Sequence, residues 1–212
     1  MKFYFIVLIS LLIFSIVNID TVDIGIEENI QQSENIDISS YKIFYVKNTK
    51  IVNIEESMIL HDNDEFSEYE HLYKVLIAQK FTPKQIKTIK EIVITNTESF
   101  SIDGVSDILG VCLNKRRDEY SSTILIASKH DDHLYTLLHE CCHALYFNNS
   151  ELFDSKYKNR WIELNQYVSN YAHTSIKEDF AETGASYLSK RTVSDDCKEK
   201  LKLFEEFYNE TK

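Results

Sequence analysis

The stretch His139-Glu140-Cys141-Cys142-His143 lies among leucines at helical spacing, and the interpretation of the whole chain starts from it. Side chains four positions apart project from nearly the same face of an α-helix, so His139 and His143 can both reach one metal ion. Glu140 points to the same side, where it can act on a water molecule bound to that metal. A chance occurrence of the pattern is expected on the order of a few per cent of the time, so the residues that follow must decide its meaning.

Length, composition and charge limit the possible classes of protein. The chain has 212 residues, which suits one domain with a substantial core, and its 43% hydrophobic and 12% aromatic content excludes a wholly disordered chain. The formal net charge of −11 argues against nucleic acid as a partner and against adhesion to anionic membranes, because phosphate groups require clustered Lys and Arg. The short basic stretch Lys115-Arg116-Arg117 is expected to be a solvated loop. With one Pro and four Gly, the chain shows no obvious flexible linker.

The N-terminus differs from the rest of the chain. Lys2 precedes an apolar run from Phe3 to Val17, and acidic, polar sequence follows from Asp20 onward. This order is typical of a secretory signal, and the run is shorter than the roughly 20 residues that a membrane-spanning helix needs. Because no clean A-x-A cleavage site follows, an uncleaved membrane anchor and a buried helix remain alternatives. The sequence predicts a signal peptide or anchor over residues 1–22, a polar tether over 23–40 and the folded domain over 41–212.

Four cysteines allow two interpretations. Cys112, Cys141, Cys142 and Cys197 are not at C-x-x-C spacing, so a Cys-rich structural zinc site is not expected. Outside the cytosol one disulfide is feasible, joining Cys197 to the helix of the motif or Cys112 to another cysteine. Buried free thiols are the alternative.

Periodicity predicts an α+β fold with a small mixed N-terminal part and a helical C-terminal half. The expected strands are Ile43–Val46, Ile51-Val52, Ile92–Ile94 and Thr123–Ile126. The expected helices are Glu65–Lys80, Gln85–Lys90 after Thr82-Pro83, one from Asp131 or Asp132 through Leu145, Leu152–Val168, Lys177–Lys190 and Asp195–Tyr208.

A zinc site of this type needs a third protein ligand and leaves one position for water. Glu178 is the best candidate because it opens a predicted helix 35 positions after His143, which can fold back against the motif. Glu182 lies one turn further on, where its carboxylate could accept the N–H of a ligand imidazole. Tyr171 lies seven residues before Glu178, and its phenol could donate to the oxyanion of a tetrahedral intermediate.

Other ligands compete for the third position. Among them His173 is the strongest rival, Glu151 follows the motif too closely, and Glu163 lacks a partner one turn away. A Cys142 thiolate is geometrically awkward. A metzincin is excluded, because Tyr146 and Asn149 occupy the positions where that class has Gly and His. Tyr171 could also be an ordinary aromatic residue, and Glu178 an ordinary carboxylate at a helix start.

The order H-E-x-x-H, Tyr171 and then the segment Glu178-Asp-Phe-Ala-Glu182 resembles the anthrax lethal factor-like metallopeptidases, and most of all the small secreted Pro-Pro endopeptidases. The similarity at the level of motifs covers His139 to about Leu188. It implies a zincin domain of the gluzincin type, with His139, His143 and Glu178 as zinc ligands, Glu140 as general base, Tyr171 as oxyanion donor and Glu182 in support. The β-like run Ile124–Ile126 before the motif agrees with a family layout in which an edge strand aligns the substrate.

The chain departs from the family pattern at several positions. Asp179 stands where the family has an aromatic residue, Thr183-Gly184 follows the Ala-Glu pair, and two cysteines fill the variable positions of the motif. Gly inside a helix is unfavourable by roughly 1 kcal/mol relative to Ala, so close helix packing would explain Gly184. None of these changes removes a catalytic group, but they leave the substrate preference open.

The sequence therefore predicts a secreted or membrane-anchored zinc endopeptidase, with residues 41–212 as its catalytic domain. It is expected to act as a monomer on peptide or protein substrates. Two alternatives stay open: a catalytically inactive zincin-fold binding module held at the cell surface, and a toxin-type peptidase that needs a separate delivery partner.

Overall fold

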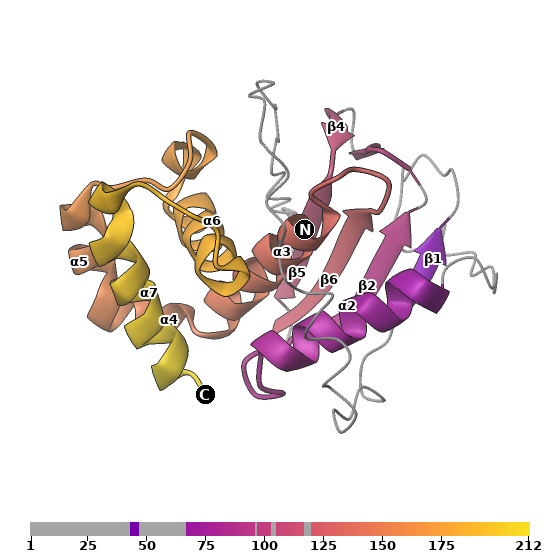
Figure 1. Ribbon diagram of the computed structural model, residues 1–212. Coiled ribbons are helices and arrows are strands. Elements are labelled where there is room, and N and C mark those ends of the chain that lie inside the picture. The colour runs from indigo at the N-terminus through magenta and orange to yellow at the C-terminus, as the bar shows by residue number, and fades with distance from the viewer. Residues whose placement is uncertain (1–42, 47–66, 96, 103–104, 117–119) are drawn as a thin grey trace, which may run out of the picture.

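The protein is described by a computed structural model, which covers residues 43–46, 67–95, 97–102, 105–116 and 120–212. Figure 1 shows a small sheet covered by one helix at the right and a group of helices at the left. Helix α3 (His133–Asn148) lies between these two parts. The coarse prediction of a mixed N-terminal part and a helical C-terminal half is confirmed. The N-terminal apolar run, the polar tether and the expected strand Ile51-Val52 lie outside the described residues.

The strands of the described residues form one four-stranded sheet and one separate pair. Their bounds are β1 Ile43–Val46, β2 Ile89–Thr95, β3 Phe100–Ile102, β4 Val105–Ile108, β5 Gly110–Arg116 and β6 Tyr120–Ala127. The order in the larger sheet is β1-β2-β6-β5, with β1, β2 and β6 parallel and β5 antiparallel to β6. Strands β3 and β4 pair antiparallel with each other. Strand β5 therefore forms one edge of the larger sheet.

Both faces of this sheet are covered by apolar groups. Alternate residues of a strand point to opposite faces. Ile92 and Ile94 of β2 thus join the core beneath α2 (Ser67–Lys80) and α3 (His133–Asn148), while Val93 packs on the other face against the β3–β4 pair. Figure 1 shows α2 lying across one face of the sheet. The β-branched run at β2 explains why it forms a buried strand.

The C-terminal half contains the remaining helical segments. They are α4 Ser150–Leu152, the π-helical turn η2 Phe153–Tyr157, α5 Lys158–Leu164, the 3₁₀ turn η3 Tyr171–Thr174, α6 Ile176–Ser189, the 3₁₀ turn η4 Asp195–Cys197 and α7 Lys198–Glu210. Their core is aromatic: the Phe180 ring lies 5.4 Å from Phe153 and 5.1 Å from Phe207, both edge-on. Such edge-to-face arrangements are the geometry that aromatic pairs prefer.

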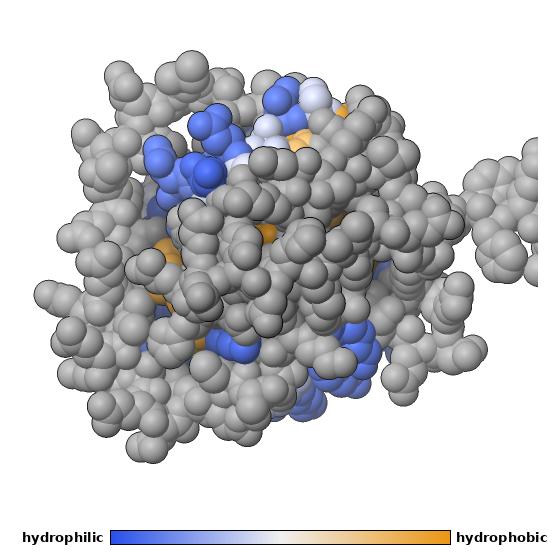
Figure 2. Space-filling model, turned by 90° about the vertical axis from the view of Figure 1, so that its right-hand side faces the viewer, coloured by the Kyte–Doolittle hydropathy of each residue, from blue (hydrophilic) through white to orange (hydrophobic). Residues whose placement is uncertain are grey.

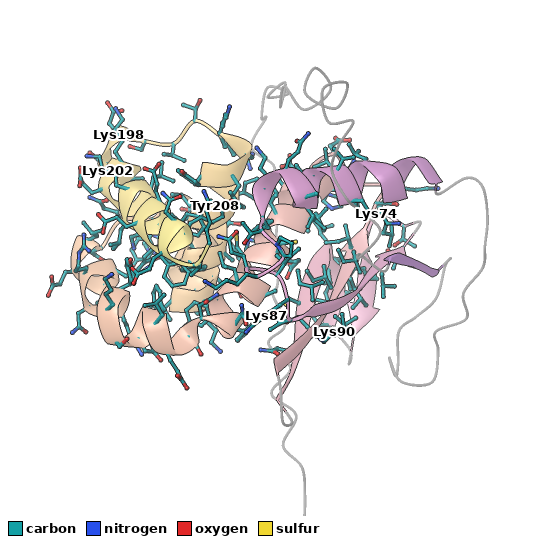
Figure 3. All side chains as sticks on the ribbon, turned by 90° about the horizontal axis from the view of Figure 1, so that it is seen from below. Lys74, Lys87, Lys90, Lys198, Lys202 and Tyr208 are labelled. Carbon is teal, nitrogen blue, oxygen red and sulfur yellow. The ribbon has the colours of Figure 1, made fainter. Side chains whose placement is uncertain are left out.

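The two halves are joined at the end of α7. The buried Gln85 side chain donates to the Tyr208 carbonyl oxygen at 2.8 Å and to the Thr211 hydroxyl at 3.0 Å. The Tyr208 hydroxyl donates to the Lys80 carbonyl oxygen at the end of α2. Figure 3 shows Tyr208 between α7 and the sheet half, while Lys198 and Lys202 project from the outer side of α7.

Two expectations about helices are wrong. No helix forms over Gln85–Lys90; the chain makes turns there and enters β2 at Ile89, because Gln85 is used to bond the C-terminal helix. The predicted helix Leu152–Val168 contains a π-helical turn and ends at Leu164, where Asn165 adopts a left-handed conformation with φ of 44°. Asn tolerates that conformation better than most residues, so it can stop the helix.

The expected loop at the basic stretch and the expected disulfide are also not found among the described residues. Lys115 and Arg116 belong to strand β5 and not to a loop, and Arg117 lies outside the described residues. All four cysteines are buried free thiols, so the disulfide interpretation is wrong and the alternative is confirmed.

The surface of the described residues is largely polar. Ile162 is the one large hydrophobic side chain exposed among them. Figure 2 views the molecule from the β1 side, where the described residues that reach the surface are mainly hydrophilic, with small apolar areas between them. Within the described ranges, no helix combines the length and apolar character that crossing a bilayer would require.

Candidate metal centre

Two helices bring the candidate site together. Helix α3 carries His139, Glu140 and His143, and α6 carries Glu178 in its first turn. The Ser175 hydroxyl caps α6 by accepting the Glu178 backbone N–H at 3.2 Å, which fixes where the helix begins. The helix that contains the motif is confirmed, although Asp132 stands at its N-cap position without a side-chain capping bond.

Gly184 lets α6 approach α3 closely. A Cβ atom at Gly184 would lie 2.6 Å from the Cys142 sulfur and 2.6 Å from a ring carbon of Phe204. Both distances are shorter than a Cβ atom can tolerate to a non-bonded atom. Close helix packing, which the sequence suggested as the reason for this glycine, is confirmed. The contact sets the distance between the helix with the two imidazoles and the helix with the carboxylate.

Three ligand atoms converge in the buried space between these helices. His139 Nε2 and His143 Nε2 are 3.0 Å apart, and each lies 3.1 Å from Glu178 Oε2. Within the described part of the chain, this is the one group of three or more His, Cys, Asp or Glu side chains with ligand atoms close enough to share a metal ion.

The spacing and chemistry of the donors fit zinc. A tetrahedral ion with Zn–N and Zn–O distances of about 2.0–2.1 Å separates its ligand atoms by about 3.3 Å, close to the observed triangle. Two imidazoles and one carboxylate are also a donor set that zinc takes in catalytic sites, where the fourth position holds water. The residues present therefore fit a zinc ion.

The charges around the triangle favour a cation at its centre. Burial lowers the pKa of His139, but hydrogen bonds to the Glu178 and Glu182 carboxylates raise it by more, leaving that pKa well above its ordinary value. Burial raises the pKa of Glu178, whereas His143 and His139 together hold it far below its usual range. The carboxylate stays ionised, so a positive charge between the three side chains is electrostatically favoured.

Glu140 lies beside the triangle. Its side chain is fully buried, and neither carboxylate oxygen meets a side-chain hydrogen-bond partner among the described residues. Burial raises the pKa of Glu140, although the His139 and His143 imidazoles and the Cys112 backbone act in the opposite direction. A buried carboxylate without a partner is unfavourable unless it serves another group, such as a water molecule on the metal.

Gly110 makes room for Glu140 at the start of strand β5. A Cβ atom there would lie 2.4 Å from Thr136 Cγ2 and 3.0 Å from Glu140 Oε1. The edge strand of the sheet therefore begins directly against the candidate base. The strand expected at this edge from sequence, Ile124–Ile126, lies in β6, which is internal between β2 and β5.

Glu182 contacts the outer nitrogen of one ligand. Its Oε1 accepts the His139 Nδ1–H at 2.8 Å, and this bond leaves the Nε2 lone pair of His139 directed toward the triangle. Burial raises the pKa of Glu182, but the hydrogen bond with His139, the charge of His139 and the hydrogen bonds from Ser169 and Tyr135 together hold that pKa below its ordinary value. The position predicted for Glu182 from sequence agrees with this contact.

Tyr171 lies at the rim of the site. It opens turn η3, it is partly exposed, and its ring lies 6.0 Å from the His139 ring. The structure thus brings Tyr171 next to the ligands, and its role as oxyanion donor stays a prediction.

The rival ligands lie outside the triangle. His173 is exposed and stacks on the Tyr167 ring at 3.7 Å, while Glu151 and Glu163 are exposed on other helices. Cys142 is buried against Gly184.

Two residues at the site were not found by sequence reasoning. Gly110 gave no signal because the strand that it begins was not expected. Tyr135 stands one turn before His139 on the same helix, and this spacing could have indicated that it faces α6.

Comparison of the whole chain with models of known protein families, with curated proteins and with solved structures finds no match in any of the three.

Proposed function

We propose that this protein is a zinc-dependent endopeptidase of the zincin type. The observation that carries the proposal is the convergence of His139, His143 and Glu178 on one point, with the buried carboxylate of Glu140 beside it and no side-chain partner for that carboxylate among the described residues. The sequence resemblance to lethal factor-like metallopeptidases supports the same assignment from the motifs alone. A buried glutamate beside the ligands suits a base better than it suits a module that only binds its ligand.

Each residue has a task that its position allows. When bound, zinc supplies a Lewis acid that lowers the pKa of a coordinated water toward about 7. Glu140 would accept the proton of a water molecule in the site as this water attacks the scissile carbonyl, and it would then deliver the proton to the departing amine. Tyr171 donates a hydrogen bond to the developing oxyanion.

Strand β5 is the proposed docking edge for the substrate. One side of β5 pairs with β6, and no other described strand pairs with its opposite side. An extended peptide that added to this edge would pass the Gly110 end of the strand and so come next to Glu140. Preference for proline around the cleaved bond follows from the resemblance alone and belongs to the proposal only as a first substrate to test.

Localisation and partners are proposed in the same way as the function. The N-terminal apolar run supports secretion, or attachment to a membrane through that run, and the negative net charge argues against nucleic acid. The expected partner is a peptide or protein, and a monomer suffices for the site because both helices come from one chain.

Metal analysis combined with peptide digestion tests the proposal. The protein should hold one zinc per chain and cleave members of a peptide library, as read by mass spectrometry, and a chelator should stop cleavage until zinc is returned. Glu140→Gln keeps the size of the side chain and should retain zinc, while turnover falls about 10²–10⁴-fold.

The outcomes separate the candidate functions. Zinc at one per chain without cleavage of any peptide would favour the binding module. A Glu140→Gln variant that cleaves at the wild-type rate would remove Glu140 as the base.

A further inference from the structure

The Glu182 carboxylate is contacted through both of its oxygens. Oε1 accepts from His139 Nδ1 at 2.8 Å, and Oε2 accepts from the Tyr135 hydroxyl at 3.3 Å. The Ser169 hydroxyl also hydrogen-bonds this carboxylate and lowers its pKa. Because Glu182 is buried, its orientation is set by these groups and not by water.

Tyr135 is itself held in one place. Its hydroxyl lies 3.1 Å from the Ser186 hydroxyl and 3.3 Å from the Glu182 carbonyl oxygen. The Arg191 guanidinium covers the Tyr135 ring at 4.7 Å and pairs with Asp132 at 3.6 Å. The ring is therefore packed between α3 and α6, with a cation on its outer face.

The Tyr135 hydroxyl also remains a donor. Burial and the neighbouring Glu182 carboxylate raise its pKa far above the ordinary value, so the phenol keeps its proton near neutral pH. Its position and protonation together let it hold Glu182 Oε2 while Oε1 holds the imidazole.

We infer that Tyr135 is a positioning residue of the metal centre, which acts through Glu182 to orient His139. The inference rests on the proposed zinc site, but it concerns a residue that touches neither the metal ligand atoms nor a substrate. Removing the phenol oxygen would leave Glu182 free to rotate away from His139, and a ligand imidazole that loses its outer partner binds metal less tightly.

Zinc affinity measured by competition with a chromogenic chelator tests this inference without any need for cleavage. Tyr135→Phe should weaken zinc binding about three- to tenfold and speed zinc release by a similar factor, a smaller effect than the 10–100-fold typical of direct partners of a ligand. Tyr146→Phe is the matched control, because Tyr146 is a buried tyrosine of the same helix that packs against Phe153 and Phe180. It should leave zinc affinity unchanged.

A double-mutant cycle separates positioning from a general structural role. If Tyr135 acts through Glu182, then Tyr135→Phe should change zinc affinity less than twofold in a Glu182→Ala background. The same cycle built on Glu182→Gln serves if the alanine variant does not fold. A full Tyr135→Phe effect in either background, or equal effects of Tyr135→Phe and Tyr146→Phe, would overturn the inference.

Failure of the inference can be told apart from failure of the proposed function. A wild-type chain that binds no zinc overturns both. A chain that binds zinc tightly, whether or not it cleaves peptides, with the same affinity in the Tyr135→Phe variant, overturns the inference alone.

Discussion

Burial and neighbouring charges set the pKa values of the two buried glutamates at the site, Glu140 and Glu178. Glu140 is enclosed without a side-chain hydrogen-bond partner among the described residues, and burial raises its pKa toward the range in which a carboxylate can accept and return a proton near neutral pH. Glu178, at a similar depth, is held ionised by two imidazoles. Two glutamates of the same chemical type are thus suited to different tasks by their neighbours alone.

Tyr171 supplies the first prediction at this scale. Tyr171→Phe should lower kcat about 10²–10³-fold, the usual effect of losing one oxyanion donor, because the ring stays beside His139 while the hydroxyl is lost. Zinc affinity should be unchanged, since Tyr171 is not one of the clustered ligands. Steady-state kinetics and chelator competition measure the two quantities. An unchanged kcat would exclude Tyr171 from the reaction.

The lowered pKa of His130, in the loop before α3, leads us to expect that the free energy of unfolding falls in acid. Burial and the nearby His133 lower its pKa to about 4, although Asp131 acts in the opposite direction, and its Nε2 has no hydrogen-bond partner among the described residues. In the unfolded chain the pKa is about 6.5, so between about pH 6.5 and 4 the unfolded state takes up the proton first and unfolding is favoured.

The His130→Asn variant measures this effect. The free energy of unfolding of the wild type should fall by about 1 kcal/mol more than that of the variant between pH 6.5 and 4, a value reduced for the partial exposure of the ring. Urea denaturation at several pH values gives both curves. Parallel curves would show that His130 does not titrate in this window.

At the level of helices, α6 is fastened to α5 and α7 by a buried ion pair next to the candidate metal ligand. Asp179 follows Glu178 directly, and its Oδ2 accepts the Lys200 ammonium at 2.7 Å and the Trp161 indole N–H at 2.7 Å. Lys200 is 1% exposed and also donates to the Trp161 carbonyl oxygen at 3.1 Å. Burial nevertheless leaves the pKa of Asp179 above its ordinary value. Asp179 stands where the metallopeptidases that the motifs resemble have an aromatic residue, and in this chain it has a charged partner on α7.

The Lys200→Met variant tests how much the Asp179–Lys200 ion pair contributes to stability. The change leaves the Asp179 carboxylate buried without its cation and should lower the free energy of unfolding by about 3–5 kcal/mol, as measured by urea denaturation. The double variant Asp179→Asn, Lys200→Met should recover much of this loss, because no buried charge remains and the amide oxygen can still accept the Trp161 N–H. A loss below about 1 kcal/mol in the single variant would contradict the role of the pair.

Elements with strong local periodicity could be predicted from the sequence, whereas those that depend on distant contacts could not. Leucines at helical spacing predicted α3, and the run at Ile92 predicted β2. The segment at Gln85 has a good local helix start, with Thr82 and Gln85 bonding each other, yet it turns because Gln85 bonds residues more than 120 positions away. Strand β5 has the apolar run Val111–Leu113 followed by polar residues, so no alternation marked it as an edge strand.

The candidate site was more predictable than the sheet that supports it. His139, His143, Glu178 and Glu182 could be proposed from the sequence because two imidazoles at helical spacing, followed by two carboxylates one turn apart on a later helix, form a recognisable pattern. Tyr135 and Gly110 are defined only by the approach of α6 and β5 to α3, which no local pattern encodes.

At the scale of the whole molecule, metal binding and folding should be coupled. The candidate ligands come from two helices, with His143 and Glu178 35 positions apart, so a zinc ion held by them would bind the folded state in preference to the unfolded chain. At a free zinc concentration 100 times the dissociation constant the gain is about 2.7 kcal/mol, which corresponds to a rise of Tm by roughly 5–10 °C for a chain of this size.

Thermal unfolding with and without a chelator measures this coupling. The wild-type Tm should fall on chelation and return with zinc. A His143→Asn variant, which loses one ligand, should show a much smaller response. Equal Tm values for the wild type in zinc and in chelator would argue that the triangle does not hold the ion.

The edge strand has a consequence for the behaviour of the protein in concentrated solution. An unpaired strand can recruit the same strand of another molecule, and proteins commonly protect such edges with lysine or other charged residues. Lys115 and Arg116 are the last two residues of β5, and the part of the strand nearer Gly110 contains no charged residue. Turbidity should therefore develop sooner when these two charges are neutralised, and a short peptide that occupies the strand should delay it.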